Sequence, residues 1–490
     1  MKEQSLKNKT VVGVGWSAAD AFFGRGITFL VGIVLARLLT PAEYGLVGIV
    51  TIFTTVLTGV VDSGFSNSLI RKTDTTNDDY NTMFITNMVV SIVLYIILYF
   101  SAPAIACFFN RPPLIDLVRV MGSILIIQAL SLVQNTILTK RIDFKTKTKA
   151  SIISAILSGA LGIAMAFAGY GVWSLVGQIL SKQLFYTICL WLYNKWWPEM
   201  IFSIVSFRYM WGFGWKLMLS GLLDRIWAQL YQTVVGKCYS PATLGQYSRA
   251  KDFAGIFSSS LTEIVQRVSF PVLSEVQNDK ERMIAGYRRI IKATMFITAI
   301  CMFFMGAVSE PFIYCLIGPQ WHEAANYLPL ICFSMSLYPL HAINLNMLQV
   351  LGRSDIFLYI EIVKKVNAIL PLCLGIFVNI YWMLVGSIFT GIIAFFLNSY
   401  YTGKSLKYTS WMQIKDVAPS YGVAILVAIS VYFLKYLPIS NWIILPLQVT
   451  VGAMAFFIFS KFLKLEEYVE LKFIAKQYLY KLTKKQLERE

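Results

Sequence analysis

The feature that most constrains this chain is a run of about twenty apolar residues that recurs from one end to the other. A helix rises about 1.5 Å per residue, so a run of this length spans the hydrocarbon core of a bilayer, roughly 30 Å. Of the 490 residues, 57% are apolar and only 14% are charged. A soluble chain of this length carries far more charge. We therefore predict an all-α integral membrane protein.

The apolar runs predict about fourteen transmembrane helices, separated by turns that contain glycine and proline. The connections are short and leave no room for an extramembrane domain. The expected spans are residues 11–38, 42–69, 79–103, 114–138, 147–169, 171–193, 209–236, 242–270, 286–317, 323–350, 355–378, 381–402, 414–437 and 440–462.

Basic residues in the connections predict the orientation. The segments on the side of the N-terminus hold 29 Lys and Arg, and the opposite loops hold seven. Cytoplasmic loops are enriched in Lys and Arg, so both termini are expected in the cytoplasm. The same bias accounts for the net charge of +17 without a nucleic-acid partner.

Two short motifs recur about 200 residues apart and indicate an internal repeat. GVGW at 13–16 is echoed by GFGW at 212–215, and TPAEYG at 40–45 is echoed by SPATLG at 240–245. Six helices separate the copies, so both enter the membrane in the same direction, as in a parallel repeat. The expected organisation is an N-terminal six-helix lobe (1–206), a C-terminal six-helix lobe (207–403), two additional helices (404–463) and a basic amphipathic cytoplasmic tail (464–490).

Placing an ionisable side chain at the bilayer centre costs roughly 3 kcal/mol, so such residues are rare and usually bind a ligand or an ion. The ionisable residues inside the expected spans are therefore the candidate site. Guanidinium suits phosphate, since it stays charged and binds two oxygens at once. An alternative is that the arginines only pair with nearby acids and hold helices together. The basic candidates for substrate binding are Arg25, Lys216, Arg225 and Lys364, and the acidic candidates for ion coupling or charge pairing are Asp20, Asp62, Asp224 and Glu263.

Small and polar residues form stripes at three- to four-residue spacing on four expected helices, and these stripes are expected to surround a central cleft between the lobes. On a further span, Glu361 and Lys365 are four residues apart and are expected to pair, whereas Lys364 points elsewhere. The stripes are Ala18, Ala21, Arg25, Thr28 and Gly32; Thr51, Thr55, Thr58 and Asp62; Gly221, Arg225, Gln229, Gln232 and Gly236; and Asp252, Gly255, Ser259, Glu263 and Gln266.

The sequence contains no catalytic or metal-binding pattern. Its seven cysteines are scattered without a CxxC, and its two histidines are isolated. It has no glycine-rich phosphate loop followed by lysine, so ATP hydrolysis is not expected. We predict a protein that is not an enzyme and has no cofactor, with H⁺ or Na⁺ coupling at Asp20 or Asp62 as a further hypothesis.

Four segments resemble a known family: LARLLTPAEYGLVG (35–48), DSGFSNSLIRK (62–72), VQNTILTKRIDF (133–144) and GYGVWSLVGQIL (169–180). They are similar to the Wzx-type polysaccharide exporters of the multidrug/oligosaccharidyl-lipid/polysaccharide flippase superfamily, such as colanic acid and teichuronic acid exporters. The resemblance implies a two-lobed helical bundle in the bacterial cytoplasmic (inner) membrane. It implies a transporter of lipid-linked oligosaccharide for lipopolysaccharide or exopolysaccharide biosynthesis.

The expected function is a flippase that moves undecaprenyl-pyrophosphate-linked oligosaccharide by alternating access through a basic central cleft. The expected partners are this anionic lipid-linked glycan, membrane lipids and polysaccharide polymerase machinery, with the chain itself a monomer. A cation-coupled multidrug exporter is the main alternative, although such a protein should favour acids in its cleft. A membrane glycan polymerase or ligase is more remote, because the external loops are short and nearly uncharged.

Overall fold

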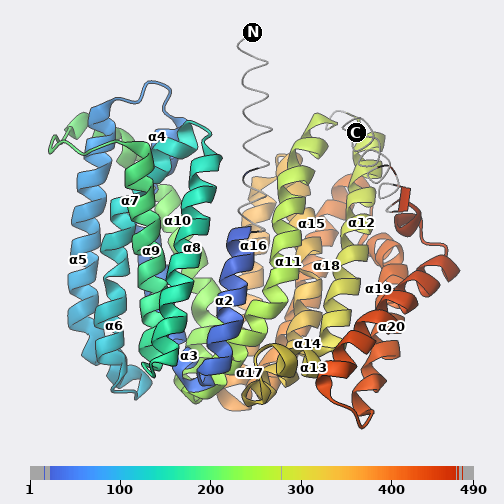
Figure 1. The fold of residues 1–490 in the computed structure, drawn as a ribbon. Coiled ribbons are helices and arrows are strands. Elements are labelled where there is room, and N and C mark those ends of the chain that lie inside the picture. Colours follow the sequence, from blue (N-terminus) through green and yellow to red (C-terminus); the bar gives the residue numbers. More distant parts are fainter. Residues whose placement is uncertain (1–15, 17–22, 277–278, 471, 474–476, 478–490) are drawn as a thin grey trace, which may run out of the picture. The chain divides into compact units, whose positions relative to one another are not determined.

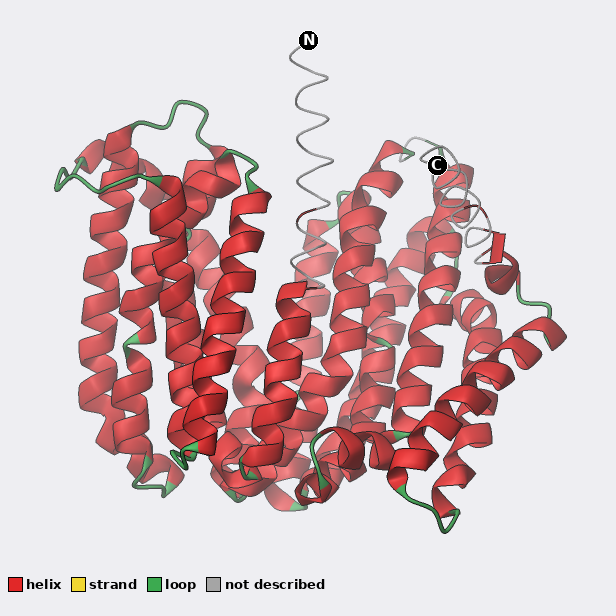
Figure 2. Cartoon of the chain, in the orientation of Figure 1, coloured by secondary structure: helices red, strands yellow, loops and turns green. Residues whose placement is uncertain are grey.

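The computed structural model describes residues 16, 23–276, 279–470, 472–473 and 477, and every regular element in this part of the chain is a helix (Figures 1 and 2). Asp20 and most of the tail from 464 lie outside the described residues. Contacts between helices divide the chain into two compact units, Met1–Gly245 (unit 1) and Gln246–Glu490 (unit 2).

Unit 1 contains nine helices in the described part of the chain. A further helix begins at Pro241, shortly before the unit ends at Gly245. The two longest of the nine have 33 and 35 residues, and the first of these runs the length of the unit at the left of Figure 1 as α5. The helices are α2 (Arg25–Leu38), α3 (Pro41–Val61), α4 (Phe65–Arg71), α5 (Asn77–Phe109), α6 (Leu114–Gly122), α7 (Ile124–Lys140), α8 (Phe144–Phe167), α9 (Val172–Asn194) and α10 (Ile204–Cys238).

Glycines allow α8 and α9 to pack closely within unit 1. A β-carbon added at Gly162 would lie 2.7 Å from Cβ of Gln178, and one at Gly177 would lie 2.6 Å from the sulfur of Met165. Because lipid is as apolar as a leucine side chain, helices in a bilayer associate through close packing of this kind. Helix α2 packs on α8, and α10 packs against α3, α4 and α5.

The first repeated motif caps a helix. Thr40 precedes α3, and its backbone N–H donates to Oε2 of Glu43 at 2.7 Å, while the backbone N–H of Glu43 donates to Oγ1 of Thr40 at 3.4 Å. This capping box, with Pro41 in the first turn, starts the helix. The second copy begins α11 (Pro241–Glu275) with a related cap, in which the backbone N–H of Thr243 donates to Oγ of Ser240 at 3.1 Å.

Unit 2 holds most of α11 and the remaining helices. These are α12 (Lys280–Ala307), α13 (Ser309–Leu316), the short 3₁₀ turn η2 (Pro319–Trp321), α14 (His322–Ser336), α15 (Tyr338–Val350), α16 (Ser354–Asn367), α17 (Ile369–Phe377), α18 (Ile380–Leu406), α19 (Ser410–Tyr432), the 3₁₀ turn η3 (Phe433–Tyr436) and α20 (Asn441–Phe462).

A buried polar cluster joins four helices of unit 2. The hydroxyl groups of Tyr287 and Thr402 donate to Oδ1 of Asn344 at 2.7 and 2.9 Å, and Nδ2 of Asn344 donates to Oε1 of Gln413 at 3.1 Å. The two additional C-terminal helices take part in this unit, since α19 packs along α12 and α20 packs on α19 and α13.

The start of the C-terminal tail contacts α12 through ion pairs. Nζ of Lys292 lies 3.0 Å from Glu466, and Arg289 lies 3.1 Å from Glu470. Leu465 is buried among side chains of unit 2. The part of the tail that the structure describes therefore packs on protein at these residues.

Ten helical segments in the described part of the chain are long and apolar enough to cross a membrane, so the chain is a multi-pass membrane protein. They coincide with ten of the fourteen expected spans, and the predicted class, an all-α membrane protein, is confirmed. Helices α2, α10, α11 and α16–α17 occupy the positions of the other four. Helices α10 and α11 carry more charge, and α2, α16 and α17 are individually short, so the count of fourteen stays a prediction.

Candidate functional site

Arg225 of α10 crosses the backbone of α3 at a glycine. Its Nη1 donates to the carbonyl oxygen of Thr55 at 3.2 Å. A β-carbon added at Gly59 would stand 2.6 Å from Cδ and 2.7 Å from Nε of Arg225. Gly59 therefore provides the space in which the arginine side chain lies, and the stripe predicted on α3 faces the stripe predicted on α10 at this level.

Asp62 ends α3 close to the same arginine. Its Oδ1 accepts from the hydroxyl of Ser66 at 2.5 Å, and Ser66 in turn accepts from the hydroxyl of Thr136 on α7 at 3.1 Å. Asp62 follows Gly59, where the Arg225 side chain packs, by three residues and so lies on the same face of α3. Two of the eight predicted site residues, Arg225 and Asp62, are thus brought together within unit 1.

The threonines of the α3 stripe bond to their own helix. The hydroxyl of Thr51 donates to the carbonyl oxygen of Val47 at 2.8 Å, and that of Thr58 donates to the carbonyl oxygen of Thr55 at 3.0 Å. Such bonds satisfy the hydroxyl hydrogen inside a membrane helix and leave oxygen lone pairs along the stripe.

Helices α2 and α9 bring a second group of polar residues together. Arg25 begins α2 and is exposed. Thr28 follows one turn later, and its Oγ1 accepts from Nζ of Lys182 on α9 at 2.9 Å. Lys182 is half-buried and is not among the predicted site residues, because no spacing rule joins positions so far apart in the sequence.

Lys216 and Asp224 are both exposed on α10. Lys216 lies between Arg225 and the N-terminal end of that helix, and Asp224 adjoins Arg225 in sequence. Their roles in substrate binding and charge pairing stay predictions.

Glu263 and Lys364 belong to unit 2, and Glu263 is half-exposed on α11. Lys364 corrects one expectation from spacing. It does not point away from Glu361, but forms an ion pair with it, with Nζ 2.5 Å from Oε1. Residues three apart on a helix are as close as residues four apart, so the spacing of Glu361 and Lys364 also allows an ion pair.

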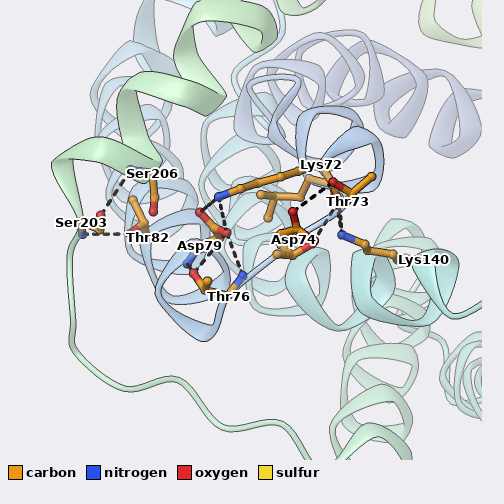
Figure 3. A network of polar contacts seen from close by, with 11 residues as sticks. Lys72, Thr73, Asp74, Thr76, Asp79, Thr82, Lys140, Ser203 and Ser206 are labelled. Carbon is orange, nitrogen blue, oxygen red and sulfur yellow. Dashed lines mark hydrogen bonds and ion pairs between the residues drawn. The ribbon is translucent and has the colours of Figure 1, made fainter.

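A polar network at the end of α3–α4 fixes where α10 begins (Figure 3). Asp79 is fully buried, accepts from Nζ of Lys72 at 2.7 and 2.8 Å, and forms a capping box with Thr76 at the start of α5. Its neighbour Thr82 accepts from the backbone N–H of Ser203, at 3.0 Å, just before α10. The helix that carries Arg225 is therefore anchored to α5.

Lys140 closes this network from α7. Its Nζ donates to the carbonyl oxygen of Leu69 at 3.1 Å and to that of Lys72. The T-x-x-D pattern at Thr76–Asp79 is a sequence signal for part of this network, because in a capping box the side chain at the third helical position accepts from the backbone N–H of the cap residue.

No group of three or more His, Cys, Asp and Glu side chains is placed to hold a metal ion within the described ranges. The side chains in these two separate groups are instead cations, one carboxylate and hydroxyl groups. This combination can bind an anion through charge-assisted hydrogen bonds.

Comparisons with known proteins find a matching family model and several relatives. The chain matches the family model described as polysaccharide biosynthesis protein over residues 34–326. It is 24% identical over 363 residues to the succinoglycan biosynthesis transport protein ExoT of Rhizobium meliloti, which is 74% of each chain. It is also 24% identical over 359 residues to the teichuronic acid biosynthesis protein TuaB of Bacillus subtilis, covering 72% of this chain and 74% of TuaB.

Two solved structures share the fold. Lipid II flippase MurJ in an inward closed conformation matches with a TM-score of 0.70 and 16% identity, covering 92% of this chain and 98% of MurJ. An inward-facing multidrug resistance MATE family transporter of the MOP superfamily matches with a TM-score of 0.60 and 16% identity, covering 80% of this chain and 99% of the transporter. At these identities the likeness concerns the fold alone.

Proposed function

Because this chain belongs to the polysaccharide biosynthesis protein family, as its sequence motifs predict, we propose that it is a flippase for lipid-linked oligosaccharide. It is a transporter and not an enzyme, in keeping with relatives such as the succinoglycan transport protein. The proposed substrate is an undecaprenyl-pyrophosphate-linked repeat unit for exopolysaccharide or lipopolysaccharide. The proposed location is the bacterial cytoplasmic membrane, with both termini in the cytoplasm.

The observation that carries the proposal is the position of the Arg225 side chain against α3. Its guanidinium is bonded to a backbone carbonyl oxygen and adjoins a glycine and the stripe of threonine side chains. A pyrophosphate group cannot enter hydrocarbon without partners, since burying an unpaired charge is far costlier than burying a paired one. Arg225 and Arg25 replace part of the water that hydrates the pyrophosphate group, and Lys216 and Lys364 are further contacts. The isoprenoid tail of the substrate stays in the lipid.

Transport follows by alternating access, with the basic central cleft that the repeat predicts opening first to the cytoplasm and then to the other side. Binding must differ between the two conformations, because only a difference in affinity shifts their populations. The chain acts as a monomer and hands its product to polysaccharide polymerase machinery.

The test is protection of a labelled lipid-linked oligosaccharide in proteoliposomes. The wild-type protein should move the label across the bilayer. Single substitutions Arg25→Ala and Arg225→Ala should slow the movement, and the double substitution should slow it further while the protein still inserts and folds. Full activity of the double variant would refute the basic-site mechanism.

A cation-coupled exporter is the second candidate, because Asp62 is an acid at the end of a membrane-spanning helix, and acids in such helices mark ion pathways. In the same vesicles, export of a cationic dye without any movement of lipid-linked glycan would favour this candidate. Asp20, Asp224 and Glu263 are the other acids proposed to pair with the basic residues or to couple H⁺ or Na⁺.

A further inference from the structure

The connection between α9 and α10 is not helical and exposes apolar side chains. It covers residues 195–203, and Figure 1 shows it in green beside the first turn of α5. Met200 is 84% exposed, so protein covers little of it. The first two residues of α10 continue the surface, since both are apolar and more than half exposed. This apolar loop surface consists of Trp197, Met200, Ile201, Phe202, Ile204 and Val205.

Hydrogen bonds hold the loop at the start of α5. The indole N–H of Trp196 donates to Oδ1 of Asn77 at 2.8 Å, and the backbone N–H of Glu199 donates to Oδ1 of Asn81 at 3.0 Å. Helix α5 has 33 residues and is about 50 Å long, which exceeds a hydrocarbon core of roughly 30 Å. Its first turn carries two aspartates. The loop therefore lies where α5 leaves the hydrocarbon.

A segment that is not helical cannot lie in the hydrocarbon itself. Its backbone N–H and C=O groups need polar partners that lipid chains do not offer, whereas a helix satisfies these groups internally. Water is the wrong surrounding for its side chains, because apolar surface is driven out of water. The head-group region of a bilayer meets both requirements, and Trp side chains such as that of Trp197 are enriched there.

Charges beside the apolar loop surface suit lipid phosphates. Lys195 begins the loop and Arg208 lies in the second turn of α10, and both are exposed. Residues 195–208 hold these two basic residues and one acidic residue, Glu199, which gives a net charge of +1. Basic residues close to a bilayer are attracted to the negative charge of its surface.

We propose that the apolar loop surface inserts into the head-group region of the bilayer and anchors the start of α10 there. Its occupant is phospholipid, and not a protein partner or a second copy of the chain. The backbone N–H of Ser203 donates to Thr82 of α5 just before α10 begins (Figure 3). An anchored loop thus fixes the depth at which the helix with Arg225 enters the membrane. The inference depends on the membrane-spanning helices and not on the proposed substrate.

The test measures how water and lipid reach a bimane label on single cysteines in liposomes, after the seven native cysteines are replaced. Met200→Cys is the reporter, and Asp74→Cys, at an exposed position in the connection before α5, is the control. Iodide on both sides of the membrane probes water, and phospholipid brominated near its glycerol probes the head-group region. At position 200, quenching by iodide should be about threefold weaker than at 74, and quenching by brominated lipid about threefold stronger.

Three results would overturn the inference. Equal iodide quenching at the two positions would place the loop in water, available to a protein partner. Stronger quenching at position 200 by lipid brominated at the chain ends would place the loop in hydrocarbon. Shielding that is lost when the lipid-to-protein ratio is raised about twentyfold would assign the surface to a second copy, because dilution in the membrane separates copies. Val205→Cys, at an exposed residue of the same surface, should reproduce the result at 200.

Discussion

Gly45 packs directly on the backbone of Pro241, and this contact joins the two copies of the repeated motif. A β-carbon added at Gly45 would overlap the carbonyl oxygen of Pro241 and stand only 2.9 Å from its Cα. The reciprocal contact is present as well, since a β-carbon at Gly245 would overlap the carbonyl oxygen of Pro41 and stand 2.8 Å from its carbonyl carbon. The two motifs therefore contact each other through equivalent residues, as expected for copies related by a two-fold axis.

Substitution Gly45→Ala should destabilise the protein by about 1–3 kcal/mol, because the backbone of Pro241 leaves the new methyl group no space. Thermal unfolding in detergent measures this. The matched control is Gly422→Ala in α19, where an added β-carbon meets no atom within 4 Å. A melting temperature for Gly45→Ala equal to that of the control would contradict the close contact.

Substitution Gly59→Ala should reduce transport more than stability. The added methyl would displace the flexible side chain of Arg225, which can move at small cost to the fold. We expect a loss of flipping of about tenfold, comparable to that of Arg225→Ala, because one charge-assisted contact is misplaced. Gly391→Ala on α18 is the control, since its new methyl has no neighbour within 4 Å. Wild-type rates for Gly59→Ala would count against the role of Arg225.

Substitution Asp62→Asn tests ion coupling. Asparagine retains an oxygen to accept from Ser66 but removes the charge that interacts with Arg225. If Asp62 couples H⁺ or Na⁺, flipping by the variant should lose its response to an imposed gradient of that ion. Rates are measured in proteoliposomes with and without the gradient. Unchanged transport and an unchanged gradient response would end the coupling hypothesis at this residue.

Substitution Asp79→Asn should destabilise unit 1 by about 1–3 kcal/mol, because it removes the charge of a fully buried carboxylate whose partner Lys72 is only partly exposed. The neighbouring exposed residue offers a control, Asp78→Asn, which should leave the melting temperature nearly unchanged. Equal stability of the two variants would show that the Lys72–Asp79 pair contributes nothing to anchoring α5.

The orientation is tested at the two ends of α8, a helix of 24 residues and so about 36 Å long. Single cysteines are introduced as Lys145→Cys and Tyr170→Cys, both at exposed positions, after the seven native cysteines are replaced. An impermeant thiol reagent added to whole cells should label position 170 and not 145. The opposite pattern would reverse the predicted topology.

Much of the architecture follows from local features of the sequence. Ten apolar segments coincide with ten expected spans because about twenty consecutive residues suffice to define a membrane helix. The caps at Thr40 and Ser240 likewise depend on residues within three positions of each other. The side chains nominated as a site were chosen by the cost of charge in a membrane, which is also a local property.

Contacts between distant residues were decided by the tertiary structure. The sequence by itself marked Arg225 and Asp62 as membrane-deep charges, but only the packing of α10 on α3 placed them together. The sequence marked Gly45 and Gly245 as equivalent positions of a repeated motif. Only the packing of the two helix starts against each other brought each glycine onto the proline of the other copy. Lys182 and Thr28 are 154 positions apart, and their bond depends on how α2 and α9 lie beside α8. Hydropathy and capping act within one helix, whereas partner choice depends on the rotation and crossing of whole helices, which short-range patterns do not encode.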